Sequence, residues 1–286
     1  MPSLIDIRRR VRSVRNTQQI TKAMKMVSAA KLRRAQERAL AARPYAAMLQ
    51  QMLANVAEAA SQSPDAGAHP LLAVRPEKRV LVVVVTADRG LAGGFNANLL
   101  KLAQRFVNAN RDKELTFELV GRKGRDYFRK RGATIAGEYI GWMRTLSLAD
   151  AQRIAGAIID RFSKGEVDAV YLFVNEFKSV MTPTLTEMRL LPIEVPKTQT
   201  TVDYIYEQKP EELLGSLLPR YIEVQIYRAL LESVAAEHAA RMTAMDAASS
   251  NASEVIDKLT LYMNRVRQAS ITREIIEIVS GAAALG

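Results

Sequence analysis

Two long stretches without glycine or proline constrain the fold of this chain more than any other feature. They run from residue 3 to residue 43 and from residue 220 to residue 280, and they are 41 and 61 residues long. Most globular helices have three or four turns, and glycine and proline are the residues that most often end them. The sequence therefore predicts a long helix near each end of the chain. At 1.5 Å per residue, the second helix would be a rod of about 90 Å.

Apolar residues follow a coiled-coil period in both predicted helices. The C-terminal helix alternates steps of three and four residues at Met242, Met245, Ser249, Ala252, Ile256, Leu259, Met263 and Val266. The N-terminal helix begins the same pattern at Leu4, Ile7, Val11 and Val14. It continues one residue out of phase at Ile20, Met24 and Val27, a slip that a supercoil can absorb. Because one helix enters the middle of the chain and the other leaves it, we expect a long antiparallel coiled coil. The alternative is a pair of ordinary amphipathic helices on a globular core, but a mid-sized domain does not cover so long a helix.

The charge of the chain is unevenly distributed. Forty-one basic and 30 acidic residues give a formal net charge of +11. Residues 1–60 contain 12 basic and 3 acidic side chains, whereas residues 210–286 contain 7 and 10. A basic helix first suggests nucleic-acid binding. However, residues 1–44 contain no aromatic side chain that would stack on bases, so an acidic protein partner is favoured over nucleic acid. A steep salt dependence of DNA binding by the isolated chain would favour the alternative.

The middle of the chain alternates between strand and helix patterns. Strands are expected at residues 79–86, 115–120, 169–174 and 184–191, the last as an edge strand between two prolines. Helices are expected at residues 97–108, 124–131 and 147–164. These patterns predict an α/β fold class, with a small open Rossmann-like domain between the two long helices. The expected segments are residues 1–60 (N-terminal coiled-coil helix), 61–209 (α/β domain with its linkers) and 210–286 (C-terminal coiled-coil helix with a protruding tip).

Catalytic and ligand-binding motifs are scarce. The turn at residues 90–94 (GLAGG) does not fit G-x-G-x-x-G, and residues 121–124 (GRKG) lack the spacing of a P-loop, so both favour tight turns. Two histidines and no cysteines argue against a zinc site, a disulfide or a catalytic thiol. Glu274 and Glu277 share a helix face, but acid/base catalysis requires a cleft, so partner contacts are favoured. We therefore expect no catalytic, cofactor-binding or metal-binding residue. A nucleotide-dependent enzyme is the alternative, and micromolar binding of ATP or NAD would favour it.

The end of the C-terminal helix is predicted to extend beyond its partner. If both helices meet the middle domain near residues 60 and 210, the second is longer by roughly 19 residues, or about 28 Å. This overhang begins at Arg267 and contains five β-branched apolar residues: Ile271, Ile275, Ile276, Ile278 and Val279. On a helical wheel they spread over roughly 160°, wider than the normal apolar stripe. A helix with so broad an apolar surface needs a surrounding sleeve from another protein.

Three sequence blocks together resemble a known family. Residues 271–282 (ITREIIEIVSGA), residues 16–27 (NTQQITKAMKMV) and residues 88–96 (DRGLAGGFN) match signatures of the gamma subunits of F-type ATP synthases. The resemblance covers essentially the whole length. Ala92 stands where many members have cysteine, and the cysteine-bearing regulatory insert of chloroplast members is absent. The thiol switch of those members is therefore not expected.

The resemblance implies a non-catalytic central rotor shaft. Such a shaft transmits the rotation of the membrane c-ring to the catalytic sites on the beta subunits and so couples proton flow to ATP synthesis or hydrolysis. The partners that it implies are the hexamer of alpha and beta subunits, the epsilon subunit and the c-ring. Contacts with beta subunits are implied for Lys22, Met24, Lys25, Met26, Arg267 and Gln268. The alpha/beta sleeve would surround Ile271, Thr272, Glu274, Ile275, Ile276, Ile278 and Val279. The foot, facing the c-ring and epsilon, would include Tyr204, Tyr206 and Glu207.

Nothing in the sequence is typical of a membrane span or an exported protein. The longest wholly apolar run is residues 80–85, far shorter than the roughly 20 residues that a span needs. The charged N-terminus also lacks the apolar region of a signal peptide. The resemblance to the family implies a peripheral location on the cytoplasmic face of a bacterial plasma membrane, as part of the complex.

Overall fold

The chain divides into two compact units. The computed structural model describes residues 3–61, 69–179, 183–194 and 208–283. The first unit consists of residues 1–28 and 241–286 and is called the paired-helix unit. The second consists of residues 29–240 and is called the α/β unit. The two long helices α1 (Leu4–Ser61) and α5 (Pro210–Ala283) contribute residues to both units.

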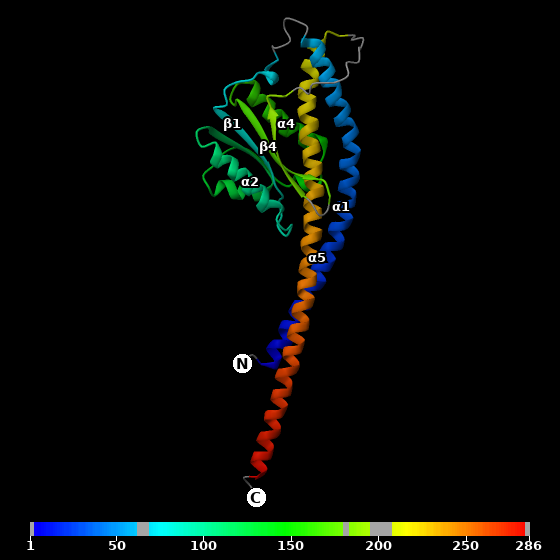
Figure 1. The fold of residues 1–286 in the computed structure, drawn as a ribbon, viewed down its shortest axis with the longest axis vertical. Coiled ribbons are helices and arrows are strands. Elements are labelled where there is room, and N and C mark those ends of the chain that lie inside the picture. The colour runs from blue at the N-terminus through cyan, green and yellow to red at the C-terminus, as the bar shows by residue number, and fades with distance from the viewer. Residues whose placement is uncertain (1–2, 62–68, 180–182, 195–207, 284–286) are drawn as a thin grey trace. The chain divides into compact units, whose positions relative to one another are not determined.

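The paired-helix unit is an antiparallel pair formed by the start of α1 and the end of α5 (Figure 1). A capping box begins α1: the Ser3 hydroxyl accepts from the Asp6 amide at 3.2 Å, and Asp6 Oδ2 accepts from the Ser3 amide at 3.3 Å. Between the helices, Lys25 Nζ lies 2.5 Å from Asp246 Oδ1. This ion pair joins positions 221 residues apart and fixes the antiparallel register of the two helices.

The predicted seam of α5 is confirmed by burial. Every one of its eight positions is buried or half-buried: Met242, Met245, Ser249, Ala252, Ile256, Leu259, Met263 and Val266. Most positions between them are exposed. The alternation of three and four residues therefore marks the face that α5 turns towards α1.

The predicted phase slip in α1 is wrong. Ile20 and Val27 are 60% and 56% exposed, and Met24 is only half-buried. The seam instead keeps its phase from Leu4, Ile7, Val11 and Val14 through four polar positions: Gln18, Thr21, Lys25 and Ser28. Since α1 is an uninterrupted α-helix with no bulge, its residues cannot change phase locally. The buried positions on either side therefore decide which side chains face the partner.

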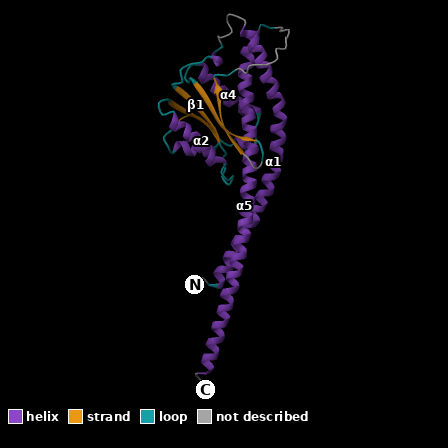
Figure 2. Ribbon diagram, viewed as in Figure 1, coloured by secondary structure: helices purple, strands orange, loops and turns teal. Residues whose placement is uncertain are grey.

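The α/β unit is built on a five-stranded sheet with the order β3-β2-β1-β4-β5 (Figure 2). Its strands are β1 (Arg79–Val85), β2 (Glu114–Val120), β3 (Thr134–Tyr139), β4 (Ala169–Phe177) and β5 (Pro183–Leu191). The first four are parallel to one another, and β5 is antiparallel to β4. The four predicted strands are confirmed, with β5 at an edge. The sequence pattern missed β3, a half-buried edge strand with glycine inside it.

Helices cover both faces of this sheet. The predicted helices are confirmed as α2 (Phe95–Ala109), α3 (Arg122–Arg129) and α4 (Leu148–Ser163), and two single 3₁₀ turns lie at Pro70–Leu72 and Trp142–Arg144. Val80, Val82 and Val84 of β1 pack on one face in a core with residues of α2 and α3. Alternate residues of β1 pack on the other face with α4, α1 and α5. β1 is therefore buried on both faces, as its continuous apolar run predicts.

Proline does not end either long helix. α1 continues through Pro44, and α5 continues through Pro219. The expected segment limits at residues 60 and 209 follow the ends of these helices. The limits of the two compact units are set by packing instead. Residues 29–60 of α1 and 210–240 of α5 therefore belong to the same unit as the sheet.

Candidate functional site

The C-terminal tail has no partner among the described residues of its own unit. Every residue from Arg267 to Ala283, here called the tail, is exposed. The exposed fractions of the apolar side chains run from 48% at Ile271 to 71% at Ile278. Leu4, near the start of α1, and Val266, just before the tail, are both half-buried, so pairing ends where α1 begins. The predicted overhang is confirmed within the paired-helix unit.

The exposed apolar surface of the tail is costly in water. Ile271, Ile275, Ile276, Ile278 and Val279 each retain about half or more of their exposure. Full burial of one such side chain is worth about 1.5–3 kcal/mol. Inside the tail, Ser270 Oγ donates to Glu274 Oε1 at 3.2 Å, but no such contact covers these apolar side chains in the described structure. The tail therefore has the physical properties of a segment that binds inside another protein surface.

The four α1 residues predicted to contact beta subunits differ in exposure: they are Lys22, Met24, Lys25 and Met26. Lys22 and Met26 are exposed, and Met26 is 67% exposed. Lys25 is half-buried and is paired with Asp246, and Met24 is half-buried too. Lys22 and Met26 are therefore presented to solvent, whereas Lys25 already has an acidic partner within the chain.

The remaining predicted site residues divide into exposed and undescribed ones. Arg267, Gln268, Thr272 and Glu274 are all exposed on the tail. Tyr204, Tyr206 and Glu207, predicted as the foot, lie outside the described residues. Glu274 and Glu277 lie on an exposed helix without a cleft. Among the described residues, no group of three or more histidine, aspartate or glutamate side chains could hold a metal ion.

The turn after β1 is closed by its own chain. Asp88 accepts from the Arg122 amide at 3.1 Å and from the Gly141 amide at 3.0 Å. The Gly124 amide donates to the Thr86 hydroxyl at 2.8 Å, and the Lys123 amide donates to the Ala87 carbonyl at 3.1 Å. The free amides at a helix start are what would bind a phosphate, and here they are used internally. This supports a tight-turn role for the glycine motif at residues 121–124.

The crevice where an open α/β sheet usually binds its ligand is filled. Such crevices lie at the carboxyl ends of strands where the strand order reverses, which here is between β1 and β4. Ala87, Ala92 and Phe95 pack there against Ala236 of α5, and all four are almost fully buried. Ala92 thus serves as a small packing residue. The C-terminal helix takes the place that a nucleotide would need.

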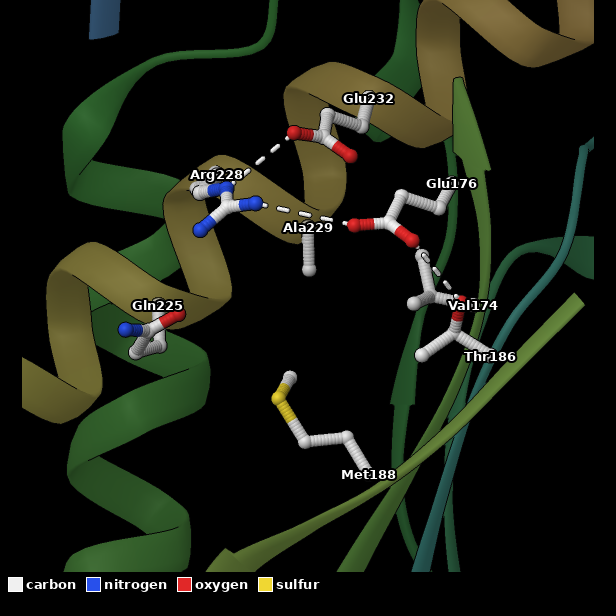
Figure 3. A pocket seen from close by; sticks show the side chains of 8 residues that line it. All are labelled: Val174, Glu176, Thr186, Met188, Gln225, Arg228, Ala229 and Glu232. Carbon is white, nitrogen blue, oxygen red and sulfur yellow. Dashed lines mark hydrogen bonds and ion pairs between the residues drawn. The ribbon is translucent and has the colours of Figure 1, made fainter. Parts of the chain in front are cut away.

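A charged cluster between β4, β5 and α5 was not found by sequence reasoning (Figure 3). Arg228 Nε donates to Glu232 Oε1 at 3.1 Å, and Arg228 Nη2 lies 3.6 Å from Glu176 Oε1. Arg43 of α1 lies 3.7 Å from Glu232, which is only 4% exposed. Arg228, Glu232 and Glu176 border a cavity of about 70 Å³ that Met188 and Thr186 also line. The i, i+4 pair Arg228–Glu232 inside an apolar stretch was the available signal.

Glu118 is a second buried charge in the α/β unit. Its side chain is fully buried on β2, and Arg161 Nε of α4 lies 3.5 Å from Glu118 Oε1. Neither carboxylate oxygen has a hydrogen-bond partner within the described structure. Burial raises the pKa of Glu118 to about 7, although the positive charge of Arg161 opposes the rise. The pairing of β2 with β3 shifts register between Phe117 and Glu118.

Glu118→Gln is expected to change the pH dependence of stability. A raised carboxyl pKa means that the folded state binds the proton more tightly than the unfolded state. The resulting stabilisation is complete below pH 4.5 and is lost as the pH rises towards 7. In Glu118→Gln this loss, on the order of 2–3 kcal/mol, should disappear. Urea unfolding at several pH values measures it, with exposed Glu138→Gln as the control. Parallel pH profiles for wild type and Glu118→Gln would contradict the expectation.

None of the helices that the structure describes has an apolar stretch long enough to cross a membrane.

Comparison with known proteins adds independent information. A family model described as ATP synthase matches residues 3–285. The ATP synthase gamma chain of Solibacter usitatus is 62% identical over 284 residues, 99% of each chain. That of Pelotomaculum thermopropionicum is 51% identical over 288 residues, and the match covers both chains completely.

Solved structures give the same picture of the fold. A chain from the Tetrahymena thermophila mitochondrial ATP synthase central stalk and c-ring is 25% identical, with a TM-score of 0.64. The match covers 80% of this chain and 99% of that one. A chain from the Euglena gracilis mitochondrial ATP synthase, in an OSCP/F1/c-ring structure, has a TM-score of 0.70 at 18% identity. It covers 99% of this chain and 94% of its own length and shows likeness of fold.

Proposed function

The chain belongs to the ATP synthase gamma-chain family, and on this basis we propose how its surfaces serve as the central rotor shaft of the complex. As a gamma chain it is a structural subunit, and catalysis takes place on the beta subunits. The shaft turns with the c-ring and forces the catalytic sites through different conformations, which couples proton flow to ATP synthesis or hydrolysis.

The exposed apolar tail is the single observation that carries the residue-level proposal. From Arg267 to Ala283 the helix has no partner among the described residues of its unit, and five β-branched side chains form a broad exposed face on it. A ring of alpha and beta subunits is a sleeve that would cover all sides of such a helix. We place Ile271, Thr272, Glu274, Ile275, Ile276, Ile278 and Val279 within that sleeve.

Contacts with individual beta subunits are proposed at two levels of the paired helices. Arg267 and Gln268 are exposed at the base of the tail, where they would meet a loop of one beta subunit. Lys22 and Met26 are exposed on α1 and would contact an acidic segment of another. Met24 and Lys25 belong to the same region, where Lys25 is paired with Asp246.

The asymmetry of the shaft explains how one subunit controls several equivalent sites. A helix pair presents different side chains in each direction, so each surrounding beta subunit meets a different contact surface. A contact can shift a conformational equilibrium only by its differential interaction with the two states. Rotation therefore changes which beta subunit is held in which affinity state. An antiparallel pair suits this role because it resists bending better than one helix.

A foot of the rotor is proposed to contact the c-ring and the epsilon subunit. Tyr204, Tyr206 and Glu207 would belong to this foot, by resemblance to the family. We propose a peripheral position on the cytoplasmic face of a bacterial plasma membrane, in keeping with the bacterial relatives. The domain itself is proposed to bind no nucleotide, because Ala236 fills the ligand crevice and the α3 amides are already bonded.

Co-purification tests this function. The tagged chain, isolated from its own host at native levels, should bring alpha and beta subunits with it, together with ATPase activity. The untagged host, treated identically, is the control for subunits that bind the resin. A tagged, folded chain that lacks both subunits and any associated ATPase would contradict the assignment.

A further inference from the structure

In one segment of α1, polar side chains face the partner helix and large apolar side chains face solvent. On α1, the four consecutive seam positions from residue 18 to residue 28 are Gln18, Thr21, Lys25 and Ser28. Thr21 and Ser28 are buried, at 9% and 3% exposure. On the opposite side of the same turns, Ile20, Met26 and Val27 are exposed. Ile20, Met26 and Val27 therefore do not help to hold the two helices together, and Met24 is the one large apolar side chain in this part of α1 that is half-buried.

The facing part of α5 does not compensate for this reversal. The Lys25–Asp246 pair sets the level of the two helices, and Ser249 and Ala252 are the next seam positions along α5. Both side chains are small, and Thr21 Oγ1 donates to the Gln18 carbonyl of its own helix rather than across the seam. Among the described residues of this segment, the large apolar side chains left at the seam are the methionines Met24, Met242 and Met245, beside one partly exposed ion pair. We call residues 18–28 and 242–252 the polar segment.

The seam nearer the start of α1 is built differently. Leu4, Ile7, Val11 and Val14 face the α5 positions Ile256, Leu259, Met263 and Val266, and all eight are buried or half-buried. Large apolar side chains on both helices make separation costly, because all of this surface would return to water. The capping box of Ser3 and Asp6 also stabilises the first turn of α1. We call residues 4–14 and 256–266 the apolar segment.

We propose that the polar segment is a built-in site of local opening, which separates and re-forms while the apolar segment stays closed. Local stability follows the density of buried apolar contacts, so a helix pair opens first where its seam is polar. Isolated helices of this length are marginal in water, so separation of the pair also loosens their backbone hydrogen bonds. The proposal rests on the paired helices alone and not on the proposed function. In a rotor, the polar segment would be the first place where the shaft twists.

Amide hydrogen exchange of the full-length chain tests the proposal directly. Helices normally fray from their ends, so ordinary behaviour would give the fastest exchange in residues 4–14 and slower exchange further along α1. The proposal predicts the reverse order, with residues 18–28 exchanging about tenfold faster than residues 7–14. Protection of residues 18–28 equal to or greater than that of residues 7–14 would overturn it.

A matched pair of variants tests whether the polar side chains are the cause. Gln18→Leu/Thr21→Leu places large apolar side chains in the seam and should slow exchange in residues 18–28 about tenfold. Thr17→Leu/Gln19→Leu makes the same two kinds of substitution at exposed positions and should leave exchange unchanged. Equal exchange in wild type and Gln18→Leu/Thr21→Leu would exclude the polar seam as the cause. Both tests have outcomes that are independent of whether the chain assembles with ATP synthase subunits.

Discussion

Ile275→Glu/Ile278→Glu is expected to lower coupled ATP synthesis by the assembled complex at least tenfold. The two isoleucines are exposed on the tail, and their proposed place is inside the alpha/beta sleeve. Each substitution removes an apolar contact worth about 1.5–3 kcal/mol and puts an unpaired carboxylate into an apolar surface. A loss of about 1.4 kcal/mol of binding free energy lowers an equilibrium constant tenfold. Even partial loss of the two apolar contacts is therefore enough for a tenfold effect. ATP synthesis by membrane vesicles, with the subunit content measured in parallel, gives the result.

Two controls separate an effect of the tail from general damage. Ser250→Glu/Ser253→Glu adds two glutamates with the same spacing at exposed positions of α5 outside the tail, and it should retain most of the activity. Trp142 is the only tryptophan and is 4% exposed in the core of the α/β unit, so its fluorescence reports whether that unit is folded. Normal assembly and synthesis by the tail variant would count against a sleeve around residues 267–286.

Arg228→Met is expected to lower the free energy of unfolding of the α/β unit by about 3 kcal/mol. Arg228 donates to Glu232, which is 4% exposed, so its removal leaves a buried carboxylate with only the longer Arg43 contact. Glu176 also loses its arginine partner, although Thr186 still donates to it at 3.3 Å. Urea unfolding followed by Trp142 fluorescence measures the change.

A double variant distinguishes an unpaired charge from lost packing. In Arg228→Met/Glu232→Met the buried charge is absent, and apolar side chains of similar length border the cavity of about 70 Å³. Replacement of a whole buried ion pair by apolar residues is often neutral or stabilising, so most of the lost stability should return. A double variant as unstable as Arg228→Met would show that packing by the arginine, rather than its charge, holds this interface.

Patterns that depend on chain geometry alone could be predicted from the sequence. The stretches without glycine and proline indicated both long helices, although α1 continues through Pro44 and α5 through Pro219. The three-four alternation from Met242 to Val266 identified the buried face of α5. β1 was recognisable because a strand buried on both faces must be apolar throughout. The exposed tail followed from the difference in length between the two helices.

Features that depend on tertiary packing could not be predicted in this way. Ile20 and Val27 suggested a shifted stripe, but the helix keeps the phase set by the buried positions on either side. β3 was missed because an edge strand needs no continuous apolar run and this one contains Gly137. In the sequence, Arg228 and Glu232 have the spacing of an ordinary exposed i, i+4 pair. The contact of α5 with the sheet is what buries the Glu232 carboxylate. Asp88 accepts from two amides far away in the sequence, which a local motif does not reveal.

Direct observation of rotation tests the central claim, that this chain is the turning part of the complex. The sequence contains no cysteine, so a single one introduced at exposed Lys123 provides a unique attachment point for a probe. With the beta subunits fixed to a surface, addition of ATP should turn the probe in one direction, with three pauses per revolution. A complex that hydrolyses ATP at its normal rate while the probe stays still would contradict a rotor role for this chain.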